Sequence, residues 1–117
     1  MIKYRDIDGL SDSLVKSRML EYNNKCDEVQ KVEEKVKELK TSMNVMESYI
    51  SFADRGKINS IIDSYSELVL ELKHEVNLLR DNIESMQRGC DHQMVNVAHD
   101  SHYDYYRCSK CGYEDRW

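Results

Sequence analysis

The stretch Val29-Gln-Lys-Val-Glu-Glu-Lys-Val-Lys-Glu-Leu39 decides the fold of this 117-residue chain. Its four apolar residues are spaced alternately by three and four positions, and the residues between them are charged or Gln. This spacing places the apolar side chains along one narrow stripe of an α-helix. The charged residues then cover the solvated faces, where i,i+4 pairs add only a few tenths of a kcal/mol each.

The same seven-residue repeat extends beyond this stretch in both directions. Arg18 and Lys25 interrupt its fourth position, and there the apolar stripe moves to the next residues, Met19 and Cys26. A strict heptad sustained over this length predicts a coiled coil. The first position of the repeat is filled by Val15, Tyr22, Val29, Val36, Met43 and Ile50, and the fourth by Arg18, Lys25, Val32, Leu39, Met46 and Ala53.

A second apolar repeat follows in a new register after Asp54-Arg55-Gly56-Lys57. Gly56 suits the left-handed residue that ends a helix, and Ser60-Ile-Ile-Asp63 has the spacing of a capping motif. We therefore predict helices over residues 14–55 and 58–88, joined as an antiparallel hairpin. The second stripe comprises Ile62, Val69, Val76 and Ile83 at the first position, and Ile58, Tyr65, Leu72, Leu79 and Met86 at the fourth.

This hairpin leads to three further expectations. Residues 1–13 form a lead-in that either ends in a helix cap (at Ser11, Asp12 or Ser13) or frays. A turn at Gly56 brings residue 89 beside residues 20–25. The extra apolar residues Ile61, Leu68, Met19 and Leu20 favour self-association into a dimer, for example as four helices; one long parallel coiled coil is the alternative, against which the break at Gly56 argues.

Two short pairs of metal-binding residues lie near the C-terminus, in Cys90-Asp-His92 and Cys108-Ser-Lys-Cys111-Gly112. Thiolates and imidazole are the donors that zinc prefers, and four of them close a tetrahedral structural site. We therefore predict a structural Zn²⁺ bound by Cys90, His92, Cys108 and Cys111, with His99 or His102 as alternatives to His92. Free thiols with incidental spacing are the other interpretation.

The predicted zinc module covers residues 89–117. Val95 and Val97 alternate with polar residues, Tyr103, Tyr105 and Tyr106 form a second β-prone run, and Asp100-Ser101 suits the turn of a β-hairpin between them. So short a segment needs its metal to fold, and a structural zinc supplies on the order of 10 kcal/mol. The fold class expected is mainly α, an antiparallel helical hairpin with a small C-terminal zinc ribbon.

The pattern Cys-x-His…Cys-x-x-Cys-Gly over Cys90–Tyr113 resembles the zinc-ribbon ends of many short bacterial and bacteriophage proteins. The resemblance implies metal binding and no particular function. A phage origin would place the protein in the host cytoplasm. The absence of a long apolar run also disfavours a membrane span, and a cytoplasmic location fits cysteines that bind metal rather than form disulfides.

The charge of the chain and its residue pattern disfavour two classes of function, nucleic-acid binding and catalysis. The chain carries a net charge of −5, and its last 28 residues hold five acids against three bases, which disfavours nucleic-acid binding although the tyrosines and Trp117 could stack on bases. Cys26 and His74 lie too far apart to form a nucleophile pair, and no enzyme motif is present.

We expect a non-enzymatic adaptor with a protein partner, such as a phage inhibitor of a host enzyme or defence complex. It would bind through the ribbon or the loop end at residues 52–59. A nucleic-acid-binding regulator and a structural coiled-coil spacer are the alternatives.

Overall fold

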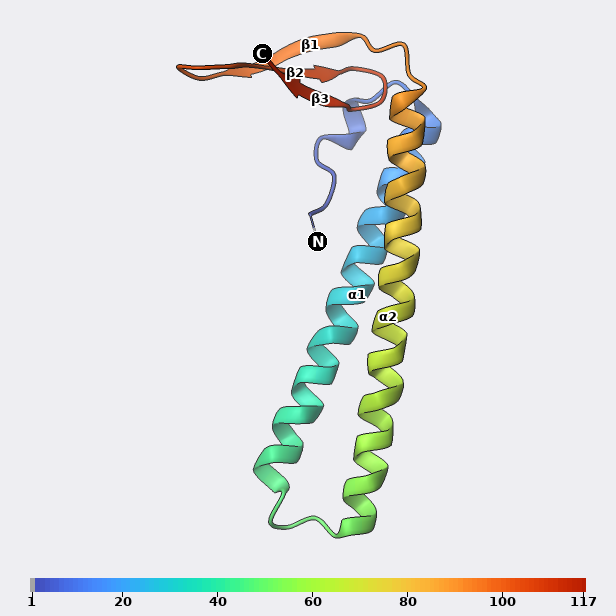
Figure 1. The fold of residues 1–117 in the computed structure, drawn as a ribbon, viewed down its shortest axis with the longest axis vertical. Coiled ribbons are helices and arrows are strands. Elements are labelled where there is room, and N and C mark those ends of the chain that lie inside the picture. Colours follow the sequence, from blue (N-terminus) through green and yellow to red (C-terminus); the bar gives the residue numbers. More distant parts are fainter. Residues whose placement is uncertain (1) are drawn as a thin grey trace. The chain divides into compact units, whose positions relative to one another are not determined.

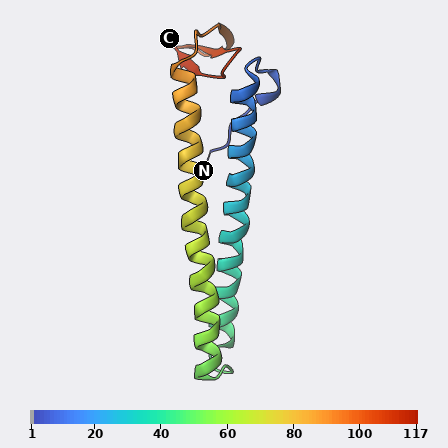
Figure 2. The ribbon, with the colours of Figure 1, turned by 90° about the vertical axis from the view of Figure 1, so that its right-hand side faces the viewer.

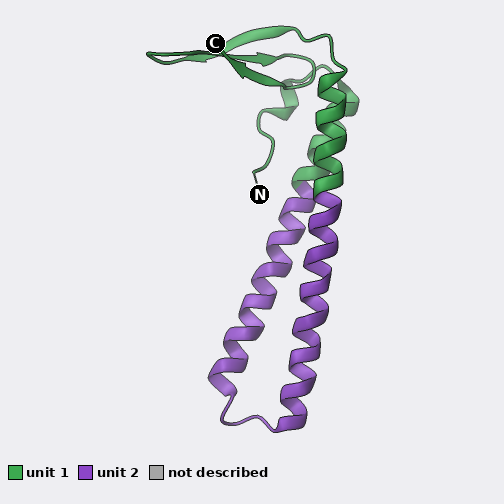
Figure 3. Cartoon of the chain, in the orientation of Figure 1, with its two compact units in different colours: residues 1–23, 77–117 green, residues 24–76 purple. Residues whose placement is uncertain are grey.

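The computed structural model describes residues 2–117. Its elements are a 3-10 turn, η1 (Ile7–Gly9), two long helices, α1 (Ser13–Met46) and α2 (Phe52–Arg88), and three strands, β1 (Met94–His99), β2 (Asp104–Cys108) and β3 (Glu114–Arg116) (Figure 1). The chain divides into two compact units (Figure 3). Unit 1 contains the residues up to Asn23 together with Asn77–Trp117, and unit 2 contains Asn24–Val76.

Within each unit the helices run side by side in opposite directions (Figures 1 and 2), so the antiparallel hairpin is confirmed. The predicted stripes are buried only in part. In the first stripe Val32, Val36, Leu39 and Met43 are half-buried. Met46 and Ala53 are exposed, because they lie beside the turn at residues 47–51, so the prediction is wrong for these two. The shift of the first stripe to Met19 and Cys26 is also confirmed, since both side chains are buried. The buried stripe residues are Val15, Met19, Tyr22, Cys26 and Val29 of α1, and Ile62, Val69, Leu72, Val76 and Ile83 of α2.

The predicted turn at Gly56 is wrong. α1 ends at Met46, α2 begins at Phe52, and Gly56 lies inside α2. The reason is a better cap upstream: the hydroxyl of Ser51 accepts a hydrogen bond from the backbone N–H of Asp54 at 3.2 Å, which stabilises a helix start by about 1 kcal/mol. Arg55, from the first turn of α2, also donates to the carbonyl of Glu47 at 2.8 Å.

The Ser60–Asp63 capping motif is wrong for the same reason. Ser60 lies within α2, and its hydroxyl donates to the carbonyl of Gly56 at 3.1 Å. This is the common bond of a mid-helix serine to the preceding turn. The turn thus lies several residues earlier than predicted, and Ile50 falls in it rather than in the first stripe.

The earlier turn changes which part of α1 lies beside the C-terminal module. The sequence placed residue 89 near residues 20–25, and this is corrected by two backbone hydrogen bonds. Ser11 N–H donates to the carbonyl of Ser109, and Asp12 N–H to that of Lys110, both at 3.1 Å. The module therefore contacts the chain immediately before the start of α1.

Residues 2–12, which we call the N-terminal segment, are docked rather than frayed. Ile7 and Leu10 are buried. The carboxylate of Asp12 accepts hydrogen bonds from the N–H groups of Leu14 (3.1 Å) and Val15 (3.2 Å), so Asp12 is the cap among the three candidates. Nearer the start, Tyr4 exchanges two hydrogen bonds with the side chain of Asn23.

Residues 89–117, which we call the ribbon, form a three-stranded antiparallel sheet in the order β1-β2-β3. The predicted hairpin is present as β1 and β2, with a bulge between Asn96 and Ala98. Its turn contains Asp100, whose carboxylate accepts from the N–H groups of His102 and Tyr103, both at 2.8 Å. The third strand was not predicted from the sequence. No helix within residues 2–117 is long and apolar enough to cross a membrane.

Candidate metal centre

The first pair of candidate ligands follows directly from the end of α2. The helix stops at Arg88, and the N–H groups of Gly89 and Cys90 donate to the carbonyls of Ser85 and Gln87. These bonds close the last turn of the helix and direct the chain out of it. Cys90 and His92 are consequently held on a segment that the helix end positions.

The second pair lies in a tight turn at the end of β2. Gly112 N–H donates to the carbonyl of Cys108 at 3.0 Å, and Cys108 N–H donates to that of Tyr113 at 2.8 Å. Gly112 has a φ of 75°, in the region that favours glycine. A β-carbon there would also lie 3.2 Å from Leu10 Cδ1 and 3.3 Å from Arg107 Nη2. The positive φ therefore favours glycine after Cys111, and a β-carbon would also require the side chains of Leu10 and Arg107 to shift by a few tenths of an ångström.

The structure brings the four predicted ligands together. One ligand atom from each of Cys90, His92, Cys108 and Cys111 lies within 4.8 Å of all the others. Cys90 Sγ and Cys108 Sγ are 3.8 Å apart, and Cys111 Sγ is 3.4 Å from His92 Nδ1. In a tetrahedral zinc site with ordinary bond lengths these separations are about 3.8 Å for S···S and about 3.6 Å for S···N. The donor spacing therefore fits a zinc-sized ion.

The electrostatics of the three thiols show why a cation suits this cluster. Burial and the neighbouring thiols raise the pKa of Cys90 to about 12, and burial also raises the pKa of Cys111. At Cys108 burial opposes ionisation, but backbone N–H groups of Cys111 and Gln93 outweigh it and lower the pKa to about 6. The protein alone thus favours one thiolate, and a divalent ion would supply the charge for all three to ionise.

Residues around the cluster tie its two ligand turns together. Lys110 Nζ lies 2.9 Å from the carboxylate of Asp91, so the spacer of one ligand pair is bound to the spacer of the other. This pair lowers the pKa of Asp91 and raises that of Lys110. Gln87 of α2 donates to the carbonyl of Cys111 at 3.0 Å. The ring of Tyr113 stacks on that of His92 with centroids 4.8 Å apart.

The other histidines and the remaining cysteine lie outside the cluster. His99 ends β1 and His102 lies in the turn after it, both exposed and neither in the metal-binding group found among residues 2–117. The structure therefore places His92, and not these alternatives, beside the thiols. Cys26 is buried in α1 with a free thiol, and His74 is exposed on α2.

Sequence reasoning missed the supporting residues of the cluster. Asp91 and Lys110 are the spacers within the two ligand motifs, so their opposite charges were a usable signal. Gln87 and Leu10 carried no such signal, because their roles depend on how α2 and the N-terminal segment pack against the ribbon.

A tetrahedral ion bound by these four side chains would have no position left for water or substrate, so the arrangement can cross-link the chain but offers no site for metal chemistry.

Comparison of this chain with protein-family models, with curated proteins and with solved structures found no significant match in any of the three.

Proposed function

We propose that this chain is a non-enzymatic binding protein in which a structural zinc ion clamps the ribbon and the helical hairpin presents a contact surface to a protein partner. The zinc part of the proposal is supported by the donor spacing of Cys90, His92, Cys108 and Cys111. Zinc is favoured over other ions because three thiolates and one imidazole in tetrahedral spacing match its preferred ligands.

The observation that carries the binding proposal is the apolar surface of the turn between the helices. The side chains of Tyr49 and Phe52 are 89% and 91% exposed, and Val45 and Met46 beside them are exposed as well. Four large apolar side chains within eight residues are costly to leave in water, and such patches typically mark interaction sites. Aromatic residues are also those that contribute most at protein interfaces.

This surface is a tip formed by the end of α1, the turn and the first residue of α2, which we call the apolar tip (Val45, Met46, Tyr49 and Phe52). It overlaps the loop end expected from the sequence at Phe52. A phage protein that blocks a host enzyme or defence complex through such a tip is one form of this function. The acidic ribbon is the alternative contact surface.

A pull-down from bacterial lysate with matched variants tests the binding proposal. The bait is the full chain, compared with a Tyr49→Ser/Phe52→Ser double variant. Leu70→Gln is the control, because Leu70 is an exposed apolar residue of α2 outside the apolar tip. We expect one stoichiometric partner that the wild type and the control retain and the double variant loses. A partner retained equally by all three would rule out the apolar tip as its site.

We also propose that two copies of the chain associate. Ile61 and Leu68 lie seven residues apart on one flank of the α2 stripe, and they remain 48% and 38% exposed in the single chain. A second copy would cover this flank and extend the apolar stripe sideways, as in four-helix arrangements. Light scattering of the purified chain at several concentrations measures the association directly.

A further inference from the structure

Unit 1 contains a cavity of about 580 Å³ that the metal cluster and the apolar tip do not involve. Four parts of unit 1 line it: the N-terminal segment, the first turns of α1, the last turns of α2 and the ribbon. Its volume lies in the range of small-molecule sites, roughly 300–1,000 Å³. The cavity is therefore large enough for a ligand the size of a nucleotide.

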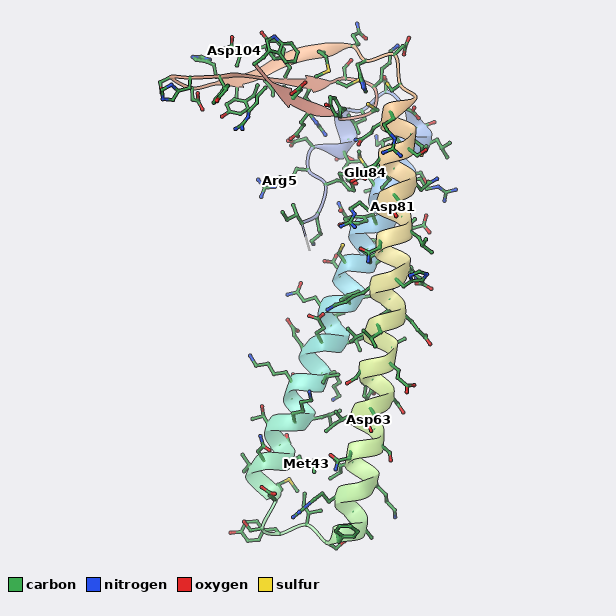
Figure 4. The ribbon with its side chains drawn as sticks, viewed as in Figure 1. Arg5, Met43, Asp63, Asp81, Glu84 and Asp104 are labelled. Carbon is green, nitrogen blue, oxygen red and sulfur yellow. The ribbon has the colours of Figure 1, made fainter. Side chains whose placement is uncertain are left out.

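The charge of the lining is opposite to that of the chain. Lys3, Arg5, Arg80 and Arg107 line the cavity together with only two acids, Asp6 and Glu114, although the net charge of the whole protein is −5. Figure 4 shows the side chain of Arg5 directed away from the two helices, so Arg5 belongs to the outer edge. Cations still outnumber acids without it, which makes the cavity a local site of attraction for anions.

Arg107 lines this cavity with a guanidinium that is anchored to the N-terminal segment. Its two terminal nitrogens donate to the carbonyls of Asp6 (3.0 Å) and Arg5 (2.7 Å). Its Nε is buried and has no hydrogen-bond acceptor among the described residues, the nearest carboxylate oxygen of Glu114 being 3.7 Å away. Because less than 1 Å² of this nitrogen is accessible, a ligand in the cavity does not contact it, and Arg107 contributes its positive charge to the cavity rather than a hydrogen bond from Nε.

Two further features mark the cavity as a site. Asp6, in its wall, has a φ of 53° and a ψ of 40°, a left-handed conformation that costs a non-glycine residue about 1 kcal/mol and is enriched at ligand sites. Arg80, on α2, has no hydrogen bond or ion pair within residues 2–117. Its planar guanidinium is thus available for the bidentate contact that arginine makes with phosphate.

The cavity also has aromatic walls. Tyr4 contributes from the N-terminal segment and Tyr113 from the ribbon. Tyr4 packs edge-on against Tyr22 with centroids 4.9 Å apart, and Tyr113 is backed by His92, so both rings are held in place by a neighbour. Fixed aromatic rings are suited to contact the flat face of a nucleobase.

We propose that this cavity binds a mononucleotide, with its phosphate at Arg80 and Lys3, near the positive charge of Arg107, and its base against Tyr4 and Tyr113. Bound ligand would connect the N-terminal segment, α2 and the ribbon. The site needs neither the apolar tip nor a protein partner, so it goes beyond the function proposed above.

Isothermal titration calorimetry on the full chain, purified without chelator and at low salt, tests the proposal. AMP, GMP, CMP and UMP are titrated separately, with adenosine and inorganic phosphate as the two partial ligands. We expect saturable binding of at least one mononucleotide, and binding at least about tenfold weaker for each partial ligand. Lack of saturation by all four at about 1 mM overturns the proposal, and so does inorganic phosphate binding as tightly as the best mononucleotide.

Two charge-matched variants locate the site. Arg80→Gln removes the available guanidinium, whereas Arg88→Gln makes the same change on the same helix outside this cavity. Both side chains are exposed, so the fold should tolerate either change, which circular dichroism verifies. Arg80→Gln should weaken binding about tenfold and Arg88→Gln less than about twofold. Equal losses in both variants would show only general attraction to positive charge and would overturn the assignment.

Discussion

The sulfur atoms of Cys90 and Cys108 lie 3.8 Å apart although the two cysteines are eighteen positions apart in the sequence. Cys90 is positioned by the end of α2, and Cys108 by the end of β2. A contact at the S···S separation of a tetrahedral zinc site, between groups held by two different elements, means that a bound ion would join the helix end to the sheet.

The first prediction concerns the metal content and the modular construction of the chain. Freshly purified protein should contain about one zinc per chain, and Cys108→Ser should lose it because Cys108 is the buried candidate ligand at the end of β2. The ribbon should unfold while most of the helical circular-dichroism signal remains. Elemental analysis measures the metal, and Cys26→Ser, a cysteine variant outside the cluster, should retain it. Less than about half a zinc per wild-type chain would contradict the assignment, and complete loss of helix in Cys108→Ser would contradict independent folding of the hairpin.

A second prediction is that acid releases the ribbon before the helices. A bound zinc ion would hold Cys90, Cys108 and Cys111 as thiolates, so the pKa of each thiol would be lower in the metal-bound fold than in the unfolded chain. Such groups stabilise the fold above the unfolded pKa of about 8.5, and the stabilisation falls with pH below it. With three thiolates, the free energy of unfolding of the ribbon should decrease by about 4 kcal/mol for each unit by which the pH is lowered, at constant free zinc.

The measurement is the midpoint of ribbon unfolding, followed by NMR of its amides at buffered free zinc between pH 8 and pH 5. The helical signal at 222 nm serves as an internal control, since the helices contain none of the ligands. Ribbon stability that does not change with pH would mean that thiolates do not bind the ion.

A third prediction tests where the chain turns. A β-carbon at Gly56 would meet nothing within 4 Å among residues 2–117, and Gly56 lies inside α2, so Gly56→Ala should stabilise the protein by about 0.5–1 kcal/mol. Ser51→Ala should destabilise it by about 1 kcal/mol, because it removes the cap of α2. Urea unfolding measures both. A turn at Gly56 would reverse the sign for Gly56→Ala, because alanine is strained in the left-handed conformation.

The fourth prediction concerns the buried stripe. Ile83 is fully buried, so Ile83→Ala should cost about 2–5 kcal/mol by leaving a cavity between the helices. Leu78, on the same helix, is exposed, and Leu78→Ala should change the free energy of unfolding by less than about 0.5 kcal/mol. Urea unfolding measures both variants. Similar losses of stability in the two would mean that the buried face of α2 has been assigned incorrectly.

The fifth prediction concerns self-association. Ile61→Gln/Leu68→Gln removes the apolar flank proposed to meet a second copy while leaving the buried stripe intact. Multi-angle light scattering should show a shift from dimer to monomer with unchanged helical content. A dimer that persists in this variant would place the interface elsewhere, and a monomeric wild type would contradict association itself.

Much of the fold could be predicted because its signals are local. The period of Val15, Tyr22 and Val29 shows which face of α1 is apolar, and the burial of Met19 and Cys26 follows the shift of that pattern. The ligands Cys90, His92, Cys108 and Cys111 were recognisable from residue type and spacing. Such features depend on residues a few positions apart, so no knowledge of packing is required.

What the sequence by itself determined about this protein is therefore the two apolar stripes and the four candidate ligands. Only the tertiary structure decided the turn at residues 47–51, the third strand, the docking of the N-terminal segment and the open cavity that this segment helps to line. In the turn, the stabilisation by the cap at Ser51 outweighs the modest cost of Gly56 within a helix. The difference between these two free energies is too small to judge from residue preferences.

The strand Glu114–Arg116 has no apolar pattern and exists because β2 offers it a free edge. The N-terminal segment docks because Arg107, about a hundred residues away, donates to its carbonyls. A hydrogen bond across that distance leaves no periodic trace in the sequence.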